Sequence, residues 1–190
     1  MEGGGLGSGT SMRMKESNEE DRLSEKLEEF HGEYFGWALA CCSGQQEDAR
    51  DVLQSAYLKV LEGRARFGGR SSFRTWMFGV IRLSAFEQRR KSFWTRMLGL
   101  GAALGTTSEE RGPEATAMAN EKIDRVREAL AGLSRRQREV LHLVFYHDLS
   151  IERAASVLGV ATGTARTHYE RGKAALRRNL GRWENEPHGR

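Results

Sequence analysis

The chain is poor in proline and cysteine and has no long apolar run. Two prolines in 190 residues leave long helices few breaks. The two cysteines, Cys41 and Cys42, are adjacent and poorly placed to bridge each other, so we interpret them as small buried apolar residues. No apolar stretch approaches the roughly 20 residues that span a bilayer, and the glycine-rich start lacks the layout of a secretory signal. We therefore expect a helical protein of the cytoplasm, without membrane insertion.

The sequence also lacks any recognisable set of catalytic residues. Its five histidines are scattered, no second Cys/His pair completes a zinc site, and no GxxxxGK[ST] loop occurs. The Gly68-Gly69 pair neither follows a strand nor opens a phosphate-binding helix. These absences predict a binding protein rather than an enzyme, with no catalytic residues, no metal and no cofactor.

Charge is sorted along the chain, although the net charge is only +4. Residues 16–62 carry roughly −8, residues 64–96 roughly +8 and residues 125–182 roughly +7. Basic blocks suit the phosphates of nucleic acid, and an acidic block suits a basic protein partner. Solvated faces with no partner are the plain alternative, but each basic block coincides with a motif.

The motif in the last basic block is a helix-turn-helix over residues 149–178. Ser150 can cap a first helix, and Gly159 supplies the backbone freedom that a sharp turn needs. The chain then restarts as a strongly basic helix that can lie in a DNA major groove. Ahead of it, Ser134 and Gln137 make a capping box for a supporting helix. Its inward residues are predicted to be Val140, Leu141, Val144 and Phe145.

Two helices are predicted in the first half. Apolar spacing indicates one amphipathic helix over about 19–42 and a second over about 47–63. On the second, three acceptor side chains share an exposed stripe that could meet a basic protein surface: Asp48, Asp51 and Gln54.

The basic block after these helices is also aromatic. Phe67, Phe73, Trp76 and Phe78 alternate with arginines, a mixture that suits unpaired bases through stacking and phosphate attraction. A place in the core is the alternative for Phe73 and Trp76. The complete prediction is an all-α protein of two small helical domains joined by a flexible linker. Its parts are a disordered tail (1–18), a first domain (19–91), the linker (92–117), a helix-turn-helix domain (118–182) and a second tail (183–190).

Three stretches together resemble a known family. They are EDARDVLQSAYLKV from residue 47, GRSSFRTWMFGVIR from residue 69, and LSRRQREVLHLVFYHDLSIERAASVLGVATGTARTHYERGKAALRR from residue 133. Their order is similar to that of the extracytoplasmic-function sigma factors of bacterial RNA polymerase, which keep only the domains called sigma-2 and sigma-4. The resemblance covers about residues 27–180. It implies a factor that binds core RNA polymerase and promoter DNA and directs promoter-specific transcription initiation.

The resemblance also implies roles by position. Core polymerase would be bound by Asp48, Asp51 and Gln54. The minus-ten element would be met by Arg70, Ser71, Phe73, Arg74, Thr75 and Trp76. The minus-thirty-five element would be met by Thr164, Arg166, Thr167, His168 and Arg171. Members of this group are usually held inactive by an anti-sigma factor, which is a further implied partner.

Four positions depart from the family's usual residues. An acid commonly stands at Arg50, asparagine at Leu83, valine or isoleucine at Ala165, and arginine at His168. Leu83 puts the usual minus-ten base contact in question, while Ala165 and His168 indicate an altered or weaker upstream preference.

Two other functions fit parts of the sequence. A dimeric helix-turn-helix repressor or activator explains the C-terminal half but leaves the acidic stripe and the aromatic segment without a role. A single-strand RNA binder would use the aromatic segment and leave the helix-turn-helix idle. Copurification with core polymerase separates the sigma-factor hypothesis from the repressor.

Overall fold

The computed structural model describes residues 22–97, 126 and 128–184, and these contain helices and connecting segments but no β-strand. The all-α prediction is therefore confirmed. The described residues form two compact units that divide between Ala85 and Phe86, inside one long helix. The first predicted tail, most of the predicted linker and the end of the second tail lie outside the described residues.

The first unit begins with two helices where the sequence predicts one. A helix over 22–29 stops at Phe30, and α2 (His31–Cys41) follows. Phe30 has φ −109° and ψ 15°, outside the helical region. Gly32 follows it closely and favours a break because glycine is a poor helix former. The prediction of a continuous helix over 19–42 is thus wrong at Phe30.

Helix α3 (Gln46–Leu61) agrees closely with the second predicted helix. Its acidic first turn, with Glu47 and Asp48, complements the positive end of the helix dipole. One face is buried and packs against α2. That face consists of Ala49, Val52, Leu53, Ala56 and Val60.

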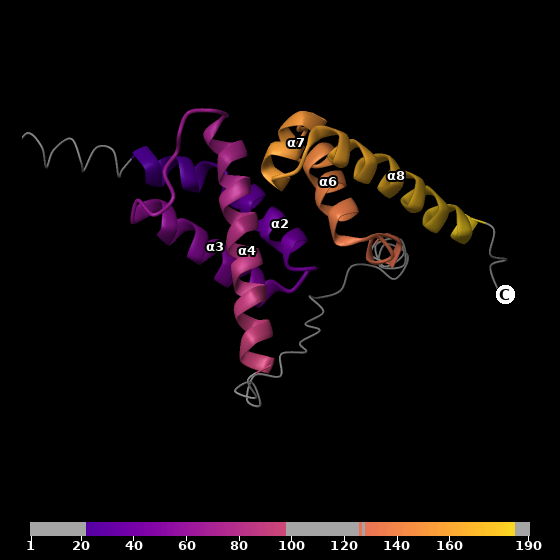
Figure 1. Ribbon diagram of the computed structural model, residues 1–190, viewed down its shortest axis with the longest axis horizontal. Coiled ribbons are helices and arrows are strands. Elements are labelled where there is room, and N and C mark those ends of the chain that lie inside the picture. Colours follow the sequence, from indigo (N-terminus) through magenta and orange to yellow (C-terminus); the bar gives the residue numbers. More distant parts are fainter. Residues whose placement is uncertain (1–21, 98–125, 127, 185–190) are drawn as a thin grey trace, which may run out of the picture. The chain divides into compact units, whose positions relative to one another are not determined.

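Helix α4 (Phe73–Met97) completes this core (Figure 1). The indole Nε1 of Trp37 in α2 donates a hydrogen bond of 2.9 Å to the backbone oxygen of Phe78. The Phe78 ring is edge-on to Tyr34 at 5.7 Å between ring centroids, and all three side chains are fully buried. Lys59 of α3 donates to the Ser84 hydroxyl at 2.9 Å, which ties α4 to α3.

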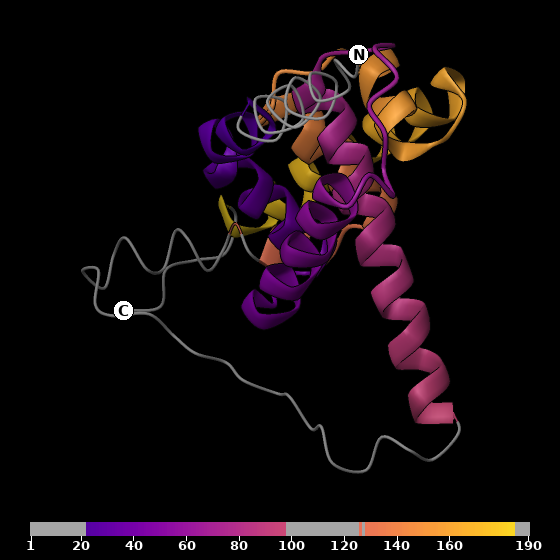
Figure 2. The same cartoon turned by 90° about the vertical axis from the view of Figure 1, so that its left-hand side faces the viewer.

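The last quarter of α4 was not expected. The helix continues to Met97, so residues 92–97, assigned from sequence to the linker, are helical. Figure 2 shows α4 as one continuous helix up to this end. Several side chains of its last turns are exposed, including Phe93 and Trp94.

The second unit contains the predicted helix-turn-helix: α6 (Arg135–Phe145), α7 (Ile151–Leu158) and α8 (Thr162–Glu184). The capping box of Ser134 and Gln137 is present, and the Ser150 hydroxyl accepts from the backbone NH of Arg153 at 3.3 Å. Gly159 ends α7 with φ +59°, a conformation that favours glycine. These predictions of caps and turn are confirmed.

Helices α6 and α8 pack closely at Gly172. A Cβ atom at this position would lie 3.0 Å from Cβ of Gln137 and from Cδ1 of Leu141, so a larger residue would push the helices apart. The core of this unit is made of Val140, Leu141, Leu143, Ala154, Ala155, Leu158 and Ala165.

Phe145 corrects a sequence prediction. It was expected to face inward, but it is 60% exposed and stacks on Tyr169 of α8 at 5.8 Å between ring centroids. The chain turns directly after it, and the buried positions there belong to His147 and Leu149. The NH of Leu149 donates to the oxygen of Leu143 at 3.0 Å, which fixes that turn.

Candidate nucleic-acid and partner interfaces

The acceptor stripe predicted on α3 lies on the surface. The structure exposes Asp48, Asp51 and Gln54, on the side of α3 away from its buried face. None of the three side chains is buried in the core of the unit, and all three are exposed on its surface. We call these three residues the docking stripe.

Two exposed leucines extend the docking stripe and were missed from sequence. Leu58 is 44% exposed and Leu61 is 45% exposed. Spacings of three and four residues place both on the same face as Asp51 and Gln54. This spacing was the available signal in the sequence. An acidic and apolar face of this kind suits a protein partner better than a nucleic acid.

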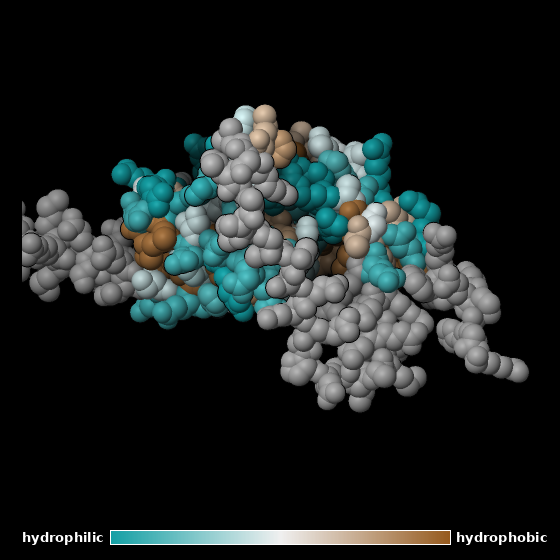
Figure 3. Space-filling view, turned by 90° about the horizontal axis from the view of Figure 1, so that it is seen from below, coloured by the Kyte–Doolittle hydropathy of each residue, from teal (hydrophilic) through white to brown (hydrophobic). Residues whose placement is uncertain are grey.

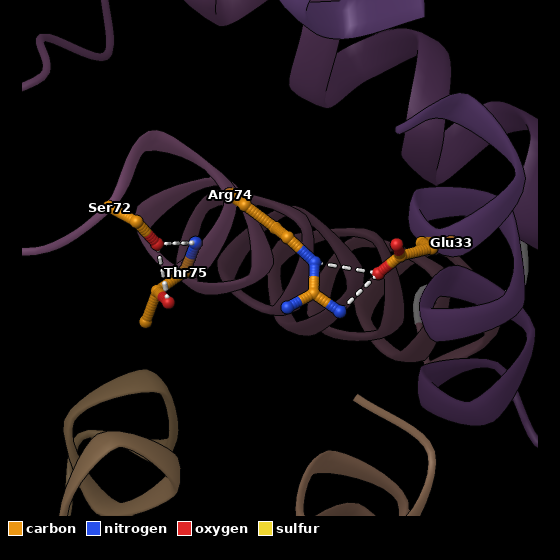
Figure 4. Close-up of polar contacts among 4 residues, drawn as sticks. All are labelled: Glu33, Ser72, Arg74 and Thr75. Carbon is orange, nitrogen blue, oxygen red and sulfur yellow. Dashed lines mark hydrogen bonds and ion pairs between the residues drawn. The ribbon is translucent and has the colours of Figure 1, made fainter. Parts of the chain in front are cut away.

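The start of α4 is fixed by a cap that the sequence did not reveal. The Ser72 hydroxyl accepts from the backbone NH of Thr75 at 3.2 Å and donates to the Thr75 hydroxyl oxygen at 2.9 Å (Figure 4). Thr75 is only 4% exposed. The structure therefore places Thr75 inside the unit, where it holds the cap, and not on the surface with the other minus-ten residues.

Arg74 lies at the same helix start but pairs with α2. Its Nε donates to Oε2 of Glu33 at 2.7 Å, and its Nη2 bonds to the same oxygen. The guanidinium carbon also lies 5.3 Å from the centre of the Phe78 ring, a cation–π distance. The guanidinium is therefore held by contacts within the protein. These contacts anchor the start of α4 to α2.

Three rings cluster beside this helix start. Phe67 from the preceding loop contacts Phe73 at 5.6 Å and Trp76 at 5.4 Å between ring centroids, and Phe73 contacts Trp76 at 5.3 Å. Phe67 is 41% exposed, while Phe73 and Trp76 are half-buried. This aromatic cluster of Phe67, Phe73 and Trp76 is therefore only partly buried. The rings are held in place by their contacts with one another and still expose part of their surface to solvent, as a surface on which bases stack requires.

The loop before the cap carries the other predicted minus-ten residues. Arg70 and Ser71 are both exposed, and Gly69 just before them has φ +69°, which favours glycine. The loop thus turns sharply and displays a guanidinium and a hydroxyl next to the aromatic cluster. The structure brings the predicted minus-ten residues together at one end of α4, apart from the buried Thr75.

The first turns of α8 carry the predicted minus-thirty-five residues. Thr164, Arg166, Thr167 and Arg171 are exposed, and His168 is half-buried. Ala165 is fully buried on the inner side of the same turns, which directs its neighbours outward. An exposed, basic helix start after a sharp turn is the arrangement by which a recognition helix enters a major groove.

Two local contacts shape this surface. Arg166 lies 3.6 Å from Glu152 of α7, with both side chains exposed. The Thr167 hydroxyl donates to the backbone oxygen of Gly163 at 2.9 Å, which occupies its donor. Because an exposed ion pair of this kind is weak, the Arg166 guanidinium can exchange Glu152 for another acceptor at little cost.

A buried polar group supports α6. Glu139 is fully buried, with Arg136 at 3.0 Å and Arg135 at 3.8 Å. Nearby, burial and the neighbouring His147 lower the pKa of His142 to about 4. These groups belong to the packing of the unit. Within the described part of the chain, no three His, Cys, Asp or Glu side chains are grouped to hold a metal ion.

Comparison with known families matches both units. The sigma-70 region 2 family matches residues 27–95, and the sigma-70 region 4 family matches residues 123–176. Together these ranges cover more than half of the chain and contain all the interface residues described above. The chain belongs to the sigma-70 family of RNA polymerase sigma factors.

Full-length relatives place it in the extracytoplasmic-function group. It is 30% identical over 139 residues to the ECF sigma factor SigX of Bacillus subtilis, covering 71% of this chain and 72% of that protein. It is 27% identical over 139 residues to the ECF sigma factor SigL of Mycobacterium tuberculosis, covering 73% of this chain and 77% of that protein. The chain is thus an ECF sigma factor, and it directs transcription initiation.

Two solved structures share the fold. The sigma factor RpoE of Bartonella quintana, in complex with the anti-sigma factor NepR, matches with a TM-score of 0.68 and 22% identity over 84% of this chain and 97% of that one. CnrH, in complex with the cytosolic domain of CnrY, matches with a TM-score of 0.60 and 20% identity over 89% and 94%. The relatives are sigma factors, and sigma factors are not enzymes. None of the described helices has the length and apolar character to cross a membrane.

Proposed function

We propose that this sigma factor docks on core RNA polymerase through the outer face of α3. The docking stripe supplies acceptors for basic groups of the partner, and Leu58 and Leu61 supply adjoining apolar contact. Asp51 and Gln54 lie on the same exposed face as the two leucines, and none of these four side chains is part of the core. The observation that carries this part is the shared surface of Asp51, Gln54 and Leu58 on one helix face.

The aromatic cluster and the loop before it are proposed to hold the unpaired strand of the minus-ten element. Trp76 and Phe67 offer ring faces for stacking, which is worth about 1–3 kcal/mol per base. Arg70 supplies a cation, and Ser71 a hydroxyl, at the exposed edge of the same cluster. Stacking of this kind exists only after strand separation, so the cluster favours the melted state over the duplex.

Arg74 and Thr75 take a different part in the same site. Arg74 is paired with Glu33, and Thr75 is buried under the cap. We assign to both a positioning role, in which they hold the start of α4 and thereby the aromatic cluster. Glu33 becomes a further residue of the site by this reasoning.

The exposed start of α8 is proposed to bind the minus-thirty-five element in the major groove. Arg166 and Arg171 are the side chains best suited to guanine edges and phosphates. Thr164 and Thr167 can contact the backbone or thymine methyl groups. His168 is half-buried and offers less of its side chain to this surface than its exposed neighbours do.

The remaining assignments concern regulation and place of action. Both solved relatives were captured with a partner protein, the anti-sigma factor NepR in one case. We extend this to the present chain and propose an anti-sigma factor as its regulator, acting in the cytoplasm, where core polymerase works. No enzymatic activity of its own is proposed.

Transcription in vitro tests the proposal. Purified protein is added to core polymerase on a randomised promoter library, and transcripts are sequenced to recover the start sites and the two upstream elements. We expect factor-dependent initiation from a subset of promoters. Specific duplex binding as a dimer, without copurification of core polymerase, would favour the helix-turn-helix repressor instead.

A further inference from the structure

Arg50 places a positive charge on the outer face of α3, among the residues proposed to dock on core polymerase. Spacings of three and four residues connect it to Glu47 before it and to Gln54 after it. The face that these spacings define is exposed throughout, and we call it the docking face. It consists of Glu47, Arg50, Asp51, Gln54, Leu58 and Leu61.

The Arg50 guanidinium is held by acceptors of its own helix. Its Nη1 donates to Oε1 of Glu47, three residues earlier. Its Nη2 donates to Oε1 of Gln46 at 3.4 Å. Both charged side chains are exposed, Arg50 at 59% and Glu47 at 75%. The Glu47 carboxylate thus has a cation beside it that belongs to the chain itself.

This pair changes the electrostatic character of the exposed side of α3. Glu47, Asp48 and Asp51 bring three negative charges to it and Arg50 brings one positive charge, so the sum is −2 instead of −3. Such a face attracts a basic partner surface less strongly, and the partner also meets Arg50 as a like charge. Protein interfaces commonly adjust specificity with a repulsive group of this kind among attractive ones.

The apolar part of the docking face does not identify a partner by itself. Exposed apolar side chains also occur outside α3, for example Phe86 and Phe145. On the face seen in Figure 3, brown apolar patches lie among teal polar side chains. The charges beside Leu58 and Leu61 therefore have to determine which surface the docking face accepts and how tightly it binds.

We propose that Arg50 sets the affinity of this factor for core polymerase, which it lowers by neutralising Glu47 within the docking face. The inference rests on the proposed docking of this face on a basic surface of the polymerase. Its consequence is a factor that occupies core polymerase only at a higher concentration than the same face would need without Arg50.

The competing assignment for Arg50 is a salt bridge to an acidic side chain of the polymerase. The two hydrogen bonds to Glu47 and Gln46 favour neutralisation, because they direct the guanidinium toward its own helix. The two assignments predict opposite effects of removing the charge. Binding becomes tighter if Arg50 neutralises Glu47, and weaker if Arg50 pairs with the polymerase.

Equilibrium binding of the full chain to purified core polymerase tests the inference. A dye on the N-terminal amine reports the Kd through fluorescence anisotropy. Arg50→Gln should bind roughly threefold more tightly than the wild type and Arg50→Glu about tenfold, since each step changes the docking face by one charge. Both gains should shrink as the salt concentration is raised from about 0.1 M to about 1 M, because salt screens exposed charges.

Arg64→Gln is the matched control. It removes the same charge from another exposed ion pair, with Glu62, beyond the end of α3, and it should bind like the wild type. Glutamine and glutamate are good helix formers, and a negative charge near the start of a helix is favourable, so both Arg50 variants should keep the wild-type helix content. Circular dichroism checks this.

The outcomes separate the inference from the docking proposal. An unchanged Kd in both Arg50 variants would overturn the inference, and so would weaker binding of Arg50→Gln, which would assign Arg50 to an acidic group of the polymerase. The variant Asp51→Lys with Gln54→Ala is measured in the same assay. Its loss of binding supports docking through α3 whatever the Arg50 variants do, whereas its normal binding would overturn the docking proposal itself.

Discussion

Arg74 at the start of α4 and Glu33 in α2, 41 residues apart, are joined through two nitrogens of one guanidinium to a single carboxylate oxygen (Figure 4). Neither side chain is buried, at 27% and 37% exposure. The guanidinium is nevertheless held from a second side by the Phe78 ring. This pair makes the direction of the helix that carries the aromatic cluster depend on α2.

Glu33→Gln tests that dependence. The change keeps the shape of the side chain but removes its charge, and we expect the free energy of unfolding to fall by about 1 kcal/mol. Glu47→Gln is the matched control, because the Glu47–Arg50 pair within α3 is much more exposed, and its loss should cost less than about 0.5 kcal/mol. Chemical denaturation followed by circular dichroism measures both. Equal losses of stability in the two variants would show that Glu33 has no special role. A double-mutant cycle with Arg74→Gln measures the interaction energy of the Glu33–Arg74 pair itself.

Core polymerase binding should depend on the outer face of α3. Asp51→Lys combined with Gln54→Ala turns attraction into repulsion, and we expect copurification with core polymerase to be lost while the helix content stays unchanged. Leu58→Ala should weaken binding about tenfold or less through lost apolar contact. Gln46→Lys adds a cation on another side of α3 and should bind normally. Normal copurification of the double variant would remove the docking proposal.

Trp76 should matter for melting and not for duplex binding. Trp76→Ala removes ring surface worth about 1–3 kcal/mol with an unpaired base, so open-complex formation should fall roughly five- to hundredfold. A premelted template should restore much of the activity, and Trp76→Phe should retain most of it. Permanganate reactivity of the promoter measures opening directly. A variant with reduced helix content would show instead that Trp76 serves the core.

The second unit should lose stability on acidification through His142. The pKa of His142 falls from 6.5 to about 4 in the folded chain because the ring is buried beside His147. Below about pH 6.5 the unfolded chain therefore binds a proton that the folded chain does not, so stability falls as pH drops toward 4. The loss amounts to about 2 kcal/mol at pH 5.

Carboxylates also titrate between pH 7 and pH 4, so the contribution of His142 to the loss of stability has to be separated from theirs. The variant His142→Leu, which lacks the titrating ring, allows that comparison. Denaturation at pH 7 and pH 5 should show a smaller loss in the variant than in the wild type. The same pH dependence in both proteins would mean that His142 does not carry the effect.

Local chemistry in the sequence determined the caps and turns of the second unit. Ser134 with Gln137, Ser150 and Gly159 act through backbone groups within four residues, so their pattern alone predicts the outcome. The motif resemblance likewise identified the family, because the docking and recognition stretches are continuous in sequence. The break in the helix at Phe30 was harder to predict from sequence. Local helix propensity indicates it only weakly, and tertiary packing determines where the helix is interrupted.

Only the tertiary structure decided which side chains are available. Arg74 and Thr75 are the two residues before Trp76 in sequence, yet Thr75 is buried and Arg74 is paired with Glu33, 41 positions away. Phe145 fits an inward pattern but is exposed, because the turn at His147 and Leu149 fills that place. The spacing of apolar residues predicts that a helix has an apolar face. Only packing between distant segments determines which face is buried in the core and which stays exposed for a partner.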